Sequence, residues 1–289
     1  MRVIRKAVPR MRRFRDFDVG HRTLLSEAVP YLALVRAPSV ARPSQPGPTE
    51  FSVATYNVHR WAGLTGGTRF EPERASSVIA ELDADVIALQ EVLRPFSSED
   101  PLVRIGEDLQ LHVAFVVTRV HKYGELGNAI LSRRPISSAF TLDLSFGRLE
   151  RRAAIATEFQ ADSGSITVVA THLALVDRSR DRQVRLLLEH SRIQGSVILL
   201  GDLNAWRKCK ATKALDRELP AEHHNLAWPP SFPSTRPLLA LDRVYARGAK
   251  VLDIRSHSTP AARRASDHLP VIARVELVRP GYEREGVAP

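Results

Sequence analysis

The stretch SVILLGDLN, residues 196–204, joins a run of apolar residues to an acidic and an amide side chain. An unbroken run of valine, isoleucine and leucine predicts a strand that is buried on both faces. Asp202 and Asn204 come where such a strand would end and open onto a cleft. This pattern recurs along the chain and decides how we interpret the whole sequence.

Other apolar segments also carry polar side chains at one end. They are FSVATYNVH (51–59) with Asn57 and His59, DVIALQEV (85–92) with Gln90 and Glu91, SITVVATHL (165–173) with His172, and LLALDRVYAR (238–247) with Asp242 and Arg243. A further polar group, Ser266–Asp267–His268, precedes the apolar segment LPVIARVEL (269–277). One such ending is commonly a turn or a cap. Their repetition predicts that these side chains meet in one site.

The order of the segments predicts an α/β fold. GNAILS (127–132) and RAAIATEF (152–159) are further expected strands, and several strands follow one another without a helix between them. Helical spacing of apolar residues predicts helices over Pro72–Leu82 and Arg178–Ile193. Strands outnumber helices, which favours two packed sheets with helices outside over a single parallel sheet.

The basic charge is concentrated at the start of the chain. Of the formal net charge of +10, residues 1–50 contribute +6, from ten Lys/Arg and four Asp/Glu. The proline-rich stretch 37–49 reads as a linker, so we expect a flexible extension over 1–50, ordered structure from Phe51, a domain over 51–278 and a flexible tail over 279–289. The basic extension is either simply solvated or binds an anionic membrane surface or nucleic acid.

Composition excludes several classes of protein. A single cysteine, Cys209, excludes a disulfide framework and any zinc site built from cysteines. No stretch of 18 apolar residues is present, which excludes a transmembrane helix. We expect a monomeric cytoplasmic protein, either free or peripheral to the membrane.

The polar groups suit metal-assisted chemistry on a phosphate ester. Glu91, Asp202, Asn204 and Asp267 offer hard oxygen ligands, which predict Mg²⁺ or Mn²⁺ rather than zinc. His172 and His268 are suited to proton transfer or to hydrogen bonds with a phosphoryl oxygen, and Asn57 and Arg152 offer donors to a phosphate. Together they predict hydrolysis by a metal-positioned water.

These segments carry a resemblance to a known family. TYNVH (55–59), ALQEV (88–92), GNAILSR (127–133), ERRAAIA (150–156), THL (171–173), GDLN (201–204), LDRVYA (241–246) and SDHLPV (266–271), in this order, resemble the endonuclease/exonuclease/phosphatase superfamily. The resemblance covers roughly Phe51 to Leu277. It implies a four-layer α/β sandwich, in which two packed mixed β-sheets are flanked by helices.

The resemblance also implies a role for each candidate residue. Glu91 is the expected main metal carboxylate, and Asn57 helps to build the metal and phosphate site. His172 is expected to donate to the scissile phosphate or the leaving group. Asp202 orients or deprotonates the water, while Asn204 binds phosphate or a second metal. Asp242 orients the first catalytic histidine, His268 is the second, Asp267 positions it or touches metal, and Arg152 contacts phosphate.

The sequence predicts the class of reaction more firmly than it predicts the substrate. We expect a divalent-metal-dependent phosphodiesterase acting on a lipid headgroup or small phosphoester; the alternatives are a DNA or RNA nuclease and a non-catalytic protein that retains the fold. Aromatic residues make up only 6% of the chain, which weakly disfavours extensive duplex contact. The number of metals and the roles of His59 and Asn128 stay open.

Overall fold

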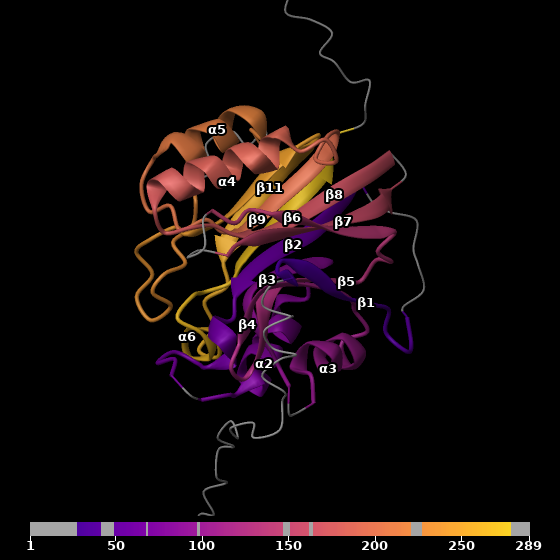
Figure 1. Ribbon diagram of the computed structural model, residues 1–289, viewed down its shortest axis with the longest axis vertical. Helices are drawn as coiled ribbons and strands as arrows, with labels where there is room; N and C mark the ends of the chain where they lie inside the picture. Colours follow the sequence, from indigo (N-terminus) through magenta and orange to yellow (C-terminus); the bar gives the residue numbers. More distant parts are fainter. Residues whose placement is uncertain are drawn as a thin grey trace, which may run out of the picture.

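The computed structural model describes residues 28–41, 49–67, 69–96, 99–146, 151–161, 164–220 and 227–278. They form two mixed β-sheets packed face to face, with helices on both outer faces (Figure 1). This is the four-layer α/β sandwich predicted from the sequence.

A seven-stranded sheet has the order β1-β4-β5-β3-β2-β12-β11 and a five-stranded sheet the order β10-β9-β8-β7-β6. The strands are β1 (Tyr31–Arg36), β2 (Glu50–Asn57), β3 (Val86–Pro95), β4 (His112–His121), β5 (Gly124–Ser132), β6 (Ser138–Asp143), β7 (Ala153–Ala161), β8 (Gly164–His172), β9 (Ser196–Asp202), β10 (Asp242–Arg247), β11 (Ala249–Ser256) and β12 (Val271–Leu277). The helices are η1 (His59–Trp61), α2 (Pro72–Leu82), α3 (Pro101–Asp108), α4 (Asp177–Glu189), α5 (Lys210–Glu218) and α6 (Ala262–Ala265).

Three apolar clusters hold the layers together. The central cluster lies between the sheets and contains Val53, Ala88, Val168 and Ile198. A second joins α2 and α3 to the seven-stranded sheet, and a third joins α4 and α5 to the five-stranded sheet. Because β2, β3, β8 and β9 are covered on both faces, they are nearly continuous apolar runs, as parallel-paired central strands require.

The topology brings the polar strand ends together. Each sheet contains one parallel pair, β2 with β3 and β8 with β9. In these pairs Asn57 lies opposite Gln90, and His172 lies opposite Asp202, at the carboxyl ends of the strands. Two rigid, buried strand pairs therefore deliver their terminal side chains to one edge of the sandwich.

The predicted elements are largely confirmed, and helix α2 has the predicted bounds. The sequence interpretation missed β4, β6 and β11, and it was wrong that ordered structure begins at Phe51. Tyr31–Arg36 pairs antiparallel with β4 as an edge strand, and the Tyr31 hydroxyl donates to Glu125 at 2.5 Å.

The domain boundaries stay predictions, and the basic residues 1–27 and the tail 279–289 lie outside the described residues. No helix among the described residues is long and apolar enough to span a membrane.

Gly201 provides a test of the close approach between β8 and β9. Its φ is +154°, and a Cβ there would lie 1.9 Å from the carbonyl oxygen of Thr171. We expect Gly201→Ala to lower the free energy of unfolding by about 3 kcal/mol in urea denaturation. The control is Gly195→Ala, where φ is +72° and nothing lies within 4 Å of the added Cβ. That variant should lose only about 1 kcal/mol. Equal losses would contradict this account of the strand pair.

Candidate active site

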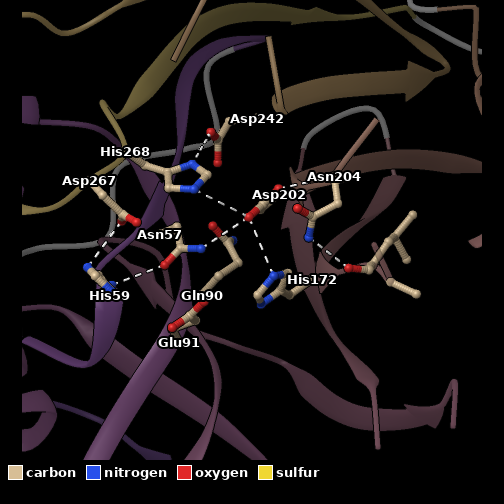
Figure 2. Close-up of polar contacts among 12 residues, drawn as sticks. Asn57, His59, Gln90, Glu91, His172, Asp202, Asn204, Asp242, Asp267 and His268 are labelled. Atoms are coloured by element: carbon tan, nitrogen blue, oxygen red, sulfur yellow. Dashed lines mark hydrogen bonds and ion pairs between the residues drawn. The ribbon is translucent and has the colours of Figure 1, made fainter. Parts of the chain in front are cut away.

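The carboxyl ends of the two parallel pairs open into a cavity of about 570 Å³. Seven of the nine predicted site residues line it: Asn57, Glu91, Arg152, His172, Asp202, Asn204 and His268. The other two support the walls, because Asp242 lies behind His268 and Asp267 lies beside His59 (Figure 2). The structure therefore gathers all nine residues at one place.

Asp202 is the centre of the site. Its side chain is only 2% exposed, and its Oδ2 accepts a hydrogen bond of 3.1 Å from Nδ2 of Asn57 in the opposite sheet. The same oxygen lies 3.4 Å from Nε2 of His172 and 3.7 Å from Nε2 of His268 (Figure 2). Oδ1 accepts from the backbone N–H of Asn204 at 3.0 Å. A buried carboxylate needs such donors, since its desolvation is otherwise costly.

Asn57 is fixed by two neighbours of opposite hydrogen-bonding character. Its Oδ1 accepts from the backbone N–H of His59 at 3.0 Å, which directs its Nδ2 to Asp202. The chain turns sharply here, with positive φ at His59, Arg60 and Trp61. The indole N–H of Trp61 donates to the carbonyl of Leu93 at 2.8 Å and anchors this turn in the core. Local backbone strain is held in place by buried contacts next to the site.

His268 is held in a chain of hydrogen bonds. Its Nδ1 lies 2.8 Å from Oδ2 of Asp242, and that oxygen also accepts from the hydroxyl of Ser231 at 2.6 Å. Burial opposes charge on the ring, but the carboxylates of Asp242 and Asp202 outweigh it and raise the pKa of His268 to about 10. The imidazole therefore carries its proton at neutral pH.

The role predicted for Asp242 needs correction. We expected it to orient the first histidine, His172, but it orients His268. The sequence separation between Asp242 and the two histidines does not distinguish them. Only the pairing of β10 with β9, which sets Asp242 opposite Asp202, brings it behind His268.

His172 has the opposite electrostatic environment. Burial and the nearby positive charge of Arg152 lower the pKa of His172 to about 3, and they outweigh the attraction of Asp202. The imidazole is therefore neutral at physiological pH. The two histidines face the same carboxylate oxygen in different protonation states.

Glu91 reaches the cavity through a β-bulge. The register between β3 and β5 shifts between Leu89 and Val92, and Glu91 adopts a left-handed conformation with φ of 53°. The bulge re-aims the side chain from the strand into the cavity, where Oε2 lies 3.5 Å from Nε of Arg60. A non-glycine residue in this conformation is a strained feature of the kind found at functional sites.

Asp267 is positioned by His59, whose role the sequence left open. Nδ1 of His59 lies 3.1 Å from the carbonyl oxygen of Gly63 and 3.3 Å from Oδ1 of Asp267. Ser266 donates to the backbone carbonyl of Asn57 at 2.6 Å and thereby ties this segment to β2. Asp267 thus lies against His59, whereas the ring of His268 is held by Asp242.

Two groups of side chains are candidates for holding a divalent metal. Asp202, Asp242 and His268 bring one potential ligand atom each within 4.8 Å of one another. In that group the Asp242 and Asp202 carboxylates raise the pKa of His268, which favours the protonated ring over a metal ligand. Glu91, Asn57 and Asp267 instead present oxygen atoms on one side of the site (Figure 2). Their donor chemistry fits Mg²⁺ or Mn²⁺.

The cavity wall includes residues that the sequence interpretation missed. Arg60, Thr118, Arg119, Arg151 and Leu175 line it in addition to Arg152. Asn128 also lines the cavity, and its Nδ2 donates to the carbonyl of Ala153 at 2.9 Å. Thr118 and Arg119 directly follow the apolar run VAFVV (113–117), a signal of the same kind that the sequence interpretation did not use. Nothing in the sequence separated Arg60 and Arg151 from surface arginines.

Arg180 joins the loops that follow β8 and β9. It is 1% exposed, and its Nη1 donates to the carbonyls of Asn204 at 2.6 Å and Ala174 at 2.8 Å. We expect Arg180→Met to lower the free energy of unfolding by about 3 kcal/mol, because it leaves buried carbonyls without a donor. The control on the same helix is Arg185→Met, which breaks an exposed pair with Asp181 and should cost under about 0.5 kcal/mol. Similar urea midpoints for the two variants would contradict this role.

Known proteins resemble this chain in sequence and in structure over most of its length. Over 262 residues the chain is 29% identical to the uncharacterized protein YbhP of Escherichia coli (strain K12), covering 81% of this chain and 100% of that protein. An endonuclease/exonuclease/phosphatase from Beutenbergia cavernae DSM 12333 has a TM-score of 0.65 at 24% identity, over 79% of this chain and 72% of that one. The human Nocturnin catalytic domain with bound sulfate anion has a TM-score of 0.63 at 20% identity, over 81% and 97% of the two chains.

A family match covers most of the described domain. Residues 54–268 match the Endonuclease/Exonuclease/phosphatase family, a span that includes every residue of the site from Asn57 to His268. The chain therefore belongs to the endonuclease/exonuclease/phosphatase family of phosphoester hydrolases.

Proposed function

We propose that this protein is a divalent-metal-dependent phosphodiesterase. The observation that carries the proposal is the convergence on Asp202 of donors from both sheets, in a cavity lined by carboxylate, imidazole and guanidinium groups. Acidic oxygens suit a metal, arginines suit a phosphate, and two histidines of different charge suit proton transfer. The coarser class, phosphoester hydrolysis, follows from the family; the diester substrate is our inference.

The metal would be held by Glu91, Asn57 and Asp267. A bound Mg²⁺ or Mn²⁺ would supply Lewis-acid stabilisation of a phosphoryl oxygen and bring a water within reach of the phosphorus. His59 keeps the Asp267 carboxylate in place, and Asp202 keeps the Asn57 amide in place. These supporting contacts orient the ligand atoms in advance of binding.

Asp202 and His268 are the proposed proton-transfer pair. Oδ2 of Asp202 is the acceptor for the proton of the attacking water, whose oxygen forms the new bond to phosphorus. His268, protonated between Asp242 and Asp202, donates its proton to the leaving oxygen as the ester bond breaks. Neutral His172 keeps its Nε2 toward Asp202 and stabilises the carboxylate. Asn204, fixed by its Nδ2 bond to the carbonyl of Leu173, offers its remaining amide hydrogen to a phosphoryl oxygen.

Arginines on the cavity wall favour an anionic substrate. Arg60, Arg119, Arg151 and Arg152 line the cavity, against the acids Glu91 and Asp202. A guanidinium recognises phosphate oxygens with two parallel hydrogen bonds. Together with burial, the positive charge of Arg152 lowers the pKa of His172, so Arg152 links phosphate binding to the charge of the site.

Metal removal tests the proposed mechanism. We expect chelator to abolish hydrolysis of a soluble aryl phosphodiester, and Mg²⁺ or Mn²⁺ to restore it, with Glu91→Gln losing at least about 10²-fold in turnover at saturating metal. The assay runs beside plasmid DNA and phospholipid substrates, with Glu81→Gln as control because Glu81 pairs with His257 and Thr259 outside the cavity. Full activity in chelator would contradict a metal-dependent mechanism. Activity on plasmid alone would make nucleic acid, rather than a lipid headgroup or small phosphoester, the phosphodiester substrate.

A further inference from the structure

An apolar edge projects beside the mouth of the cavity. Leu175 and Val176, in the loop after β8, are 59% and 58% exposed, and Trp206, in the loop after β9, is 50% exposed. Leu175 also lines the cavity. Exposed apolar side chains mark a site of interaction where they form one continuous surface.

The two loops form one surface because they are fastened together. Nη1 of Arg180 donates to the carbonyls of Ala174 and Asn204, and its guanidinium lies 5.9 Å from the ring centre of Trp206. Nη2 of Arg207 donates to Oδ2 of Asp177 at 2.9 Å. Buried Arg180 and the exposed pair of Arg207 with Asp177 thus connect the two loops. We call the surface made by Leu175, Val176 and Trp206 the apolar rim.

The apolar rim borders a basic surface. Helices α4 and α5 lie side by side on the outer face of the five-stranded sheet (Figure 1). At their amino-terminal ends Arg178, Arg207, Lys208, Lys210 and Lys213 surround an open hollow of about 600 Å³. Its acids are already neutralised, Asp177 by Arg180 and Arg207, and Asp181 by Arg185. Arg178 and the three lysines form no ion pair with the described part of the chain.

We propose that the apolar rim and this basic surface dock the protein on an anionic lipid bilayer. Tryptophan and aliphatic side chains enter the boundary between headgroups and hydrocarbon, while lysine and arginine are attracted by anionic headgroups. Nucleic acid fits less well, because Leu175 and Val176 offer neither stacking nor hydrogen bonds. Docking in this way sets the cavity mouth against the bilayer, so phosphodiesters of lipid headgroups are the substrate class. This last step rests on the proposed function; the docking itself does not.

Vesicle binding by the full chain tests the proposal. The protein is sedimented with vesicles of phosphatidylcholine, alone or mixed equally with phosphatidylglycerol. We expect the wild-type protein to bind the anionic vesicles. Its partitioning onto them should fall roughly tenfold in Val176→Ser/Trp206→Ser. In Lys208→Ala/Lys213→Ala it should fall roughly fivefold for each lysine removed. The matched control is Lys250→Ala/Leu252→Ser on strand β11, which removes one exposed lysine and one exposed leucine that belong neither to the apolar rim nor to the basic surface. Unchanged thermal midpoints show that the variants fold.

The outcomes separate docking from catalysis. Wild-type protein that stays in the supernatant, or Val176→Ser/Trp206→Ser that binds vesicles as well as wild type, would overturn the docking surface. Retention of duplex DNA without vesicle binding would assign the basic surface to nucleic acid instead. Val176→Ser/Trp206→Ser should hydrolyse a soluble aryl phosphodiester at the wild-type rate but vesicle phospholipid more slowly. Vesicle binding without any hydrolysis would contradict the proposed function and leave docking standing.

Discussion

The hydrogen bonds that the buried carboxylate of Asp202 accepts are the interactions on which the rest of the site depends. This carboxylate stands at the end of β9 in one sheet and accepts a hydrogen bond from Asn57 at the end of β2 in the other. A nearly fully buried carboxylate is stable only where donors surround it, and here they come from segments far apart in the chain. The two sheets must therefore pack in one relative position for the site to exist. Asn57, His172, Asn204 and His268 are all placed by that requirement.

The same carboxylate gives the two histidines different properties. Both rings are buried, and burial alone favours the neutral form. His268 also faces Asp242, so negative charge on two sides keeps its proton, whereas His172 faces Arg152 and stays neutral. A proton donor and a neutral hydrogen-bonding ring thus share one cavity. This division arises from the second neighbour of each ring, since Asp202 is common to both.

Much of the fold could be predicted because buried strands have an unmistakable apolar pattern. The polar endings of those strands also identified the main site residues. What failed depends on contacts between elements. Strand β1 lies before the predicted linker, within the segment 1–50 that was expected to be a flexible extension, and it is ordered by pairing with β4. The partner of Asp242 depends on how β10 and the segment before β12 meet.

The most direct test of the central claim is the hydrolysis of a soluble aryl phosphodiester by Asp202→Asn at saturating Mg²⁺. The substitution keeps the size of the side chain but removes the negative charge that Asn57, His172 and His268 share, and replaces one of its two acceptor oxygens with an NH₂ donor. The account predicts a loss of at least about 10³-fold in turnover by a variant that retains the far-ultraviolet circular dichroism of the wild type. Turnover within tenfold of wild type would show that phosphoester hydrolysis does not depend on Asp202, and would contradict the account.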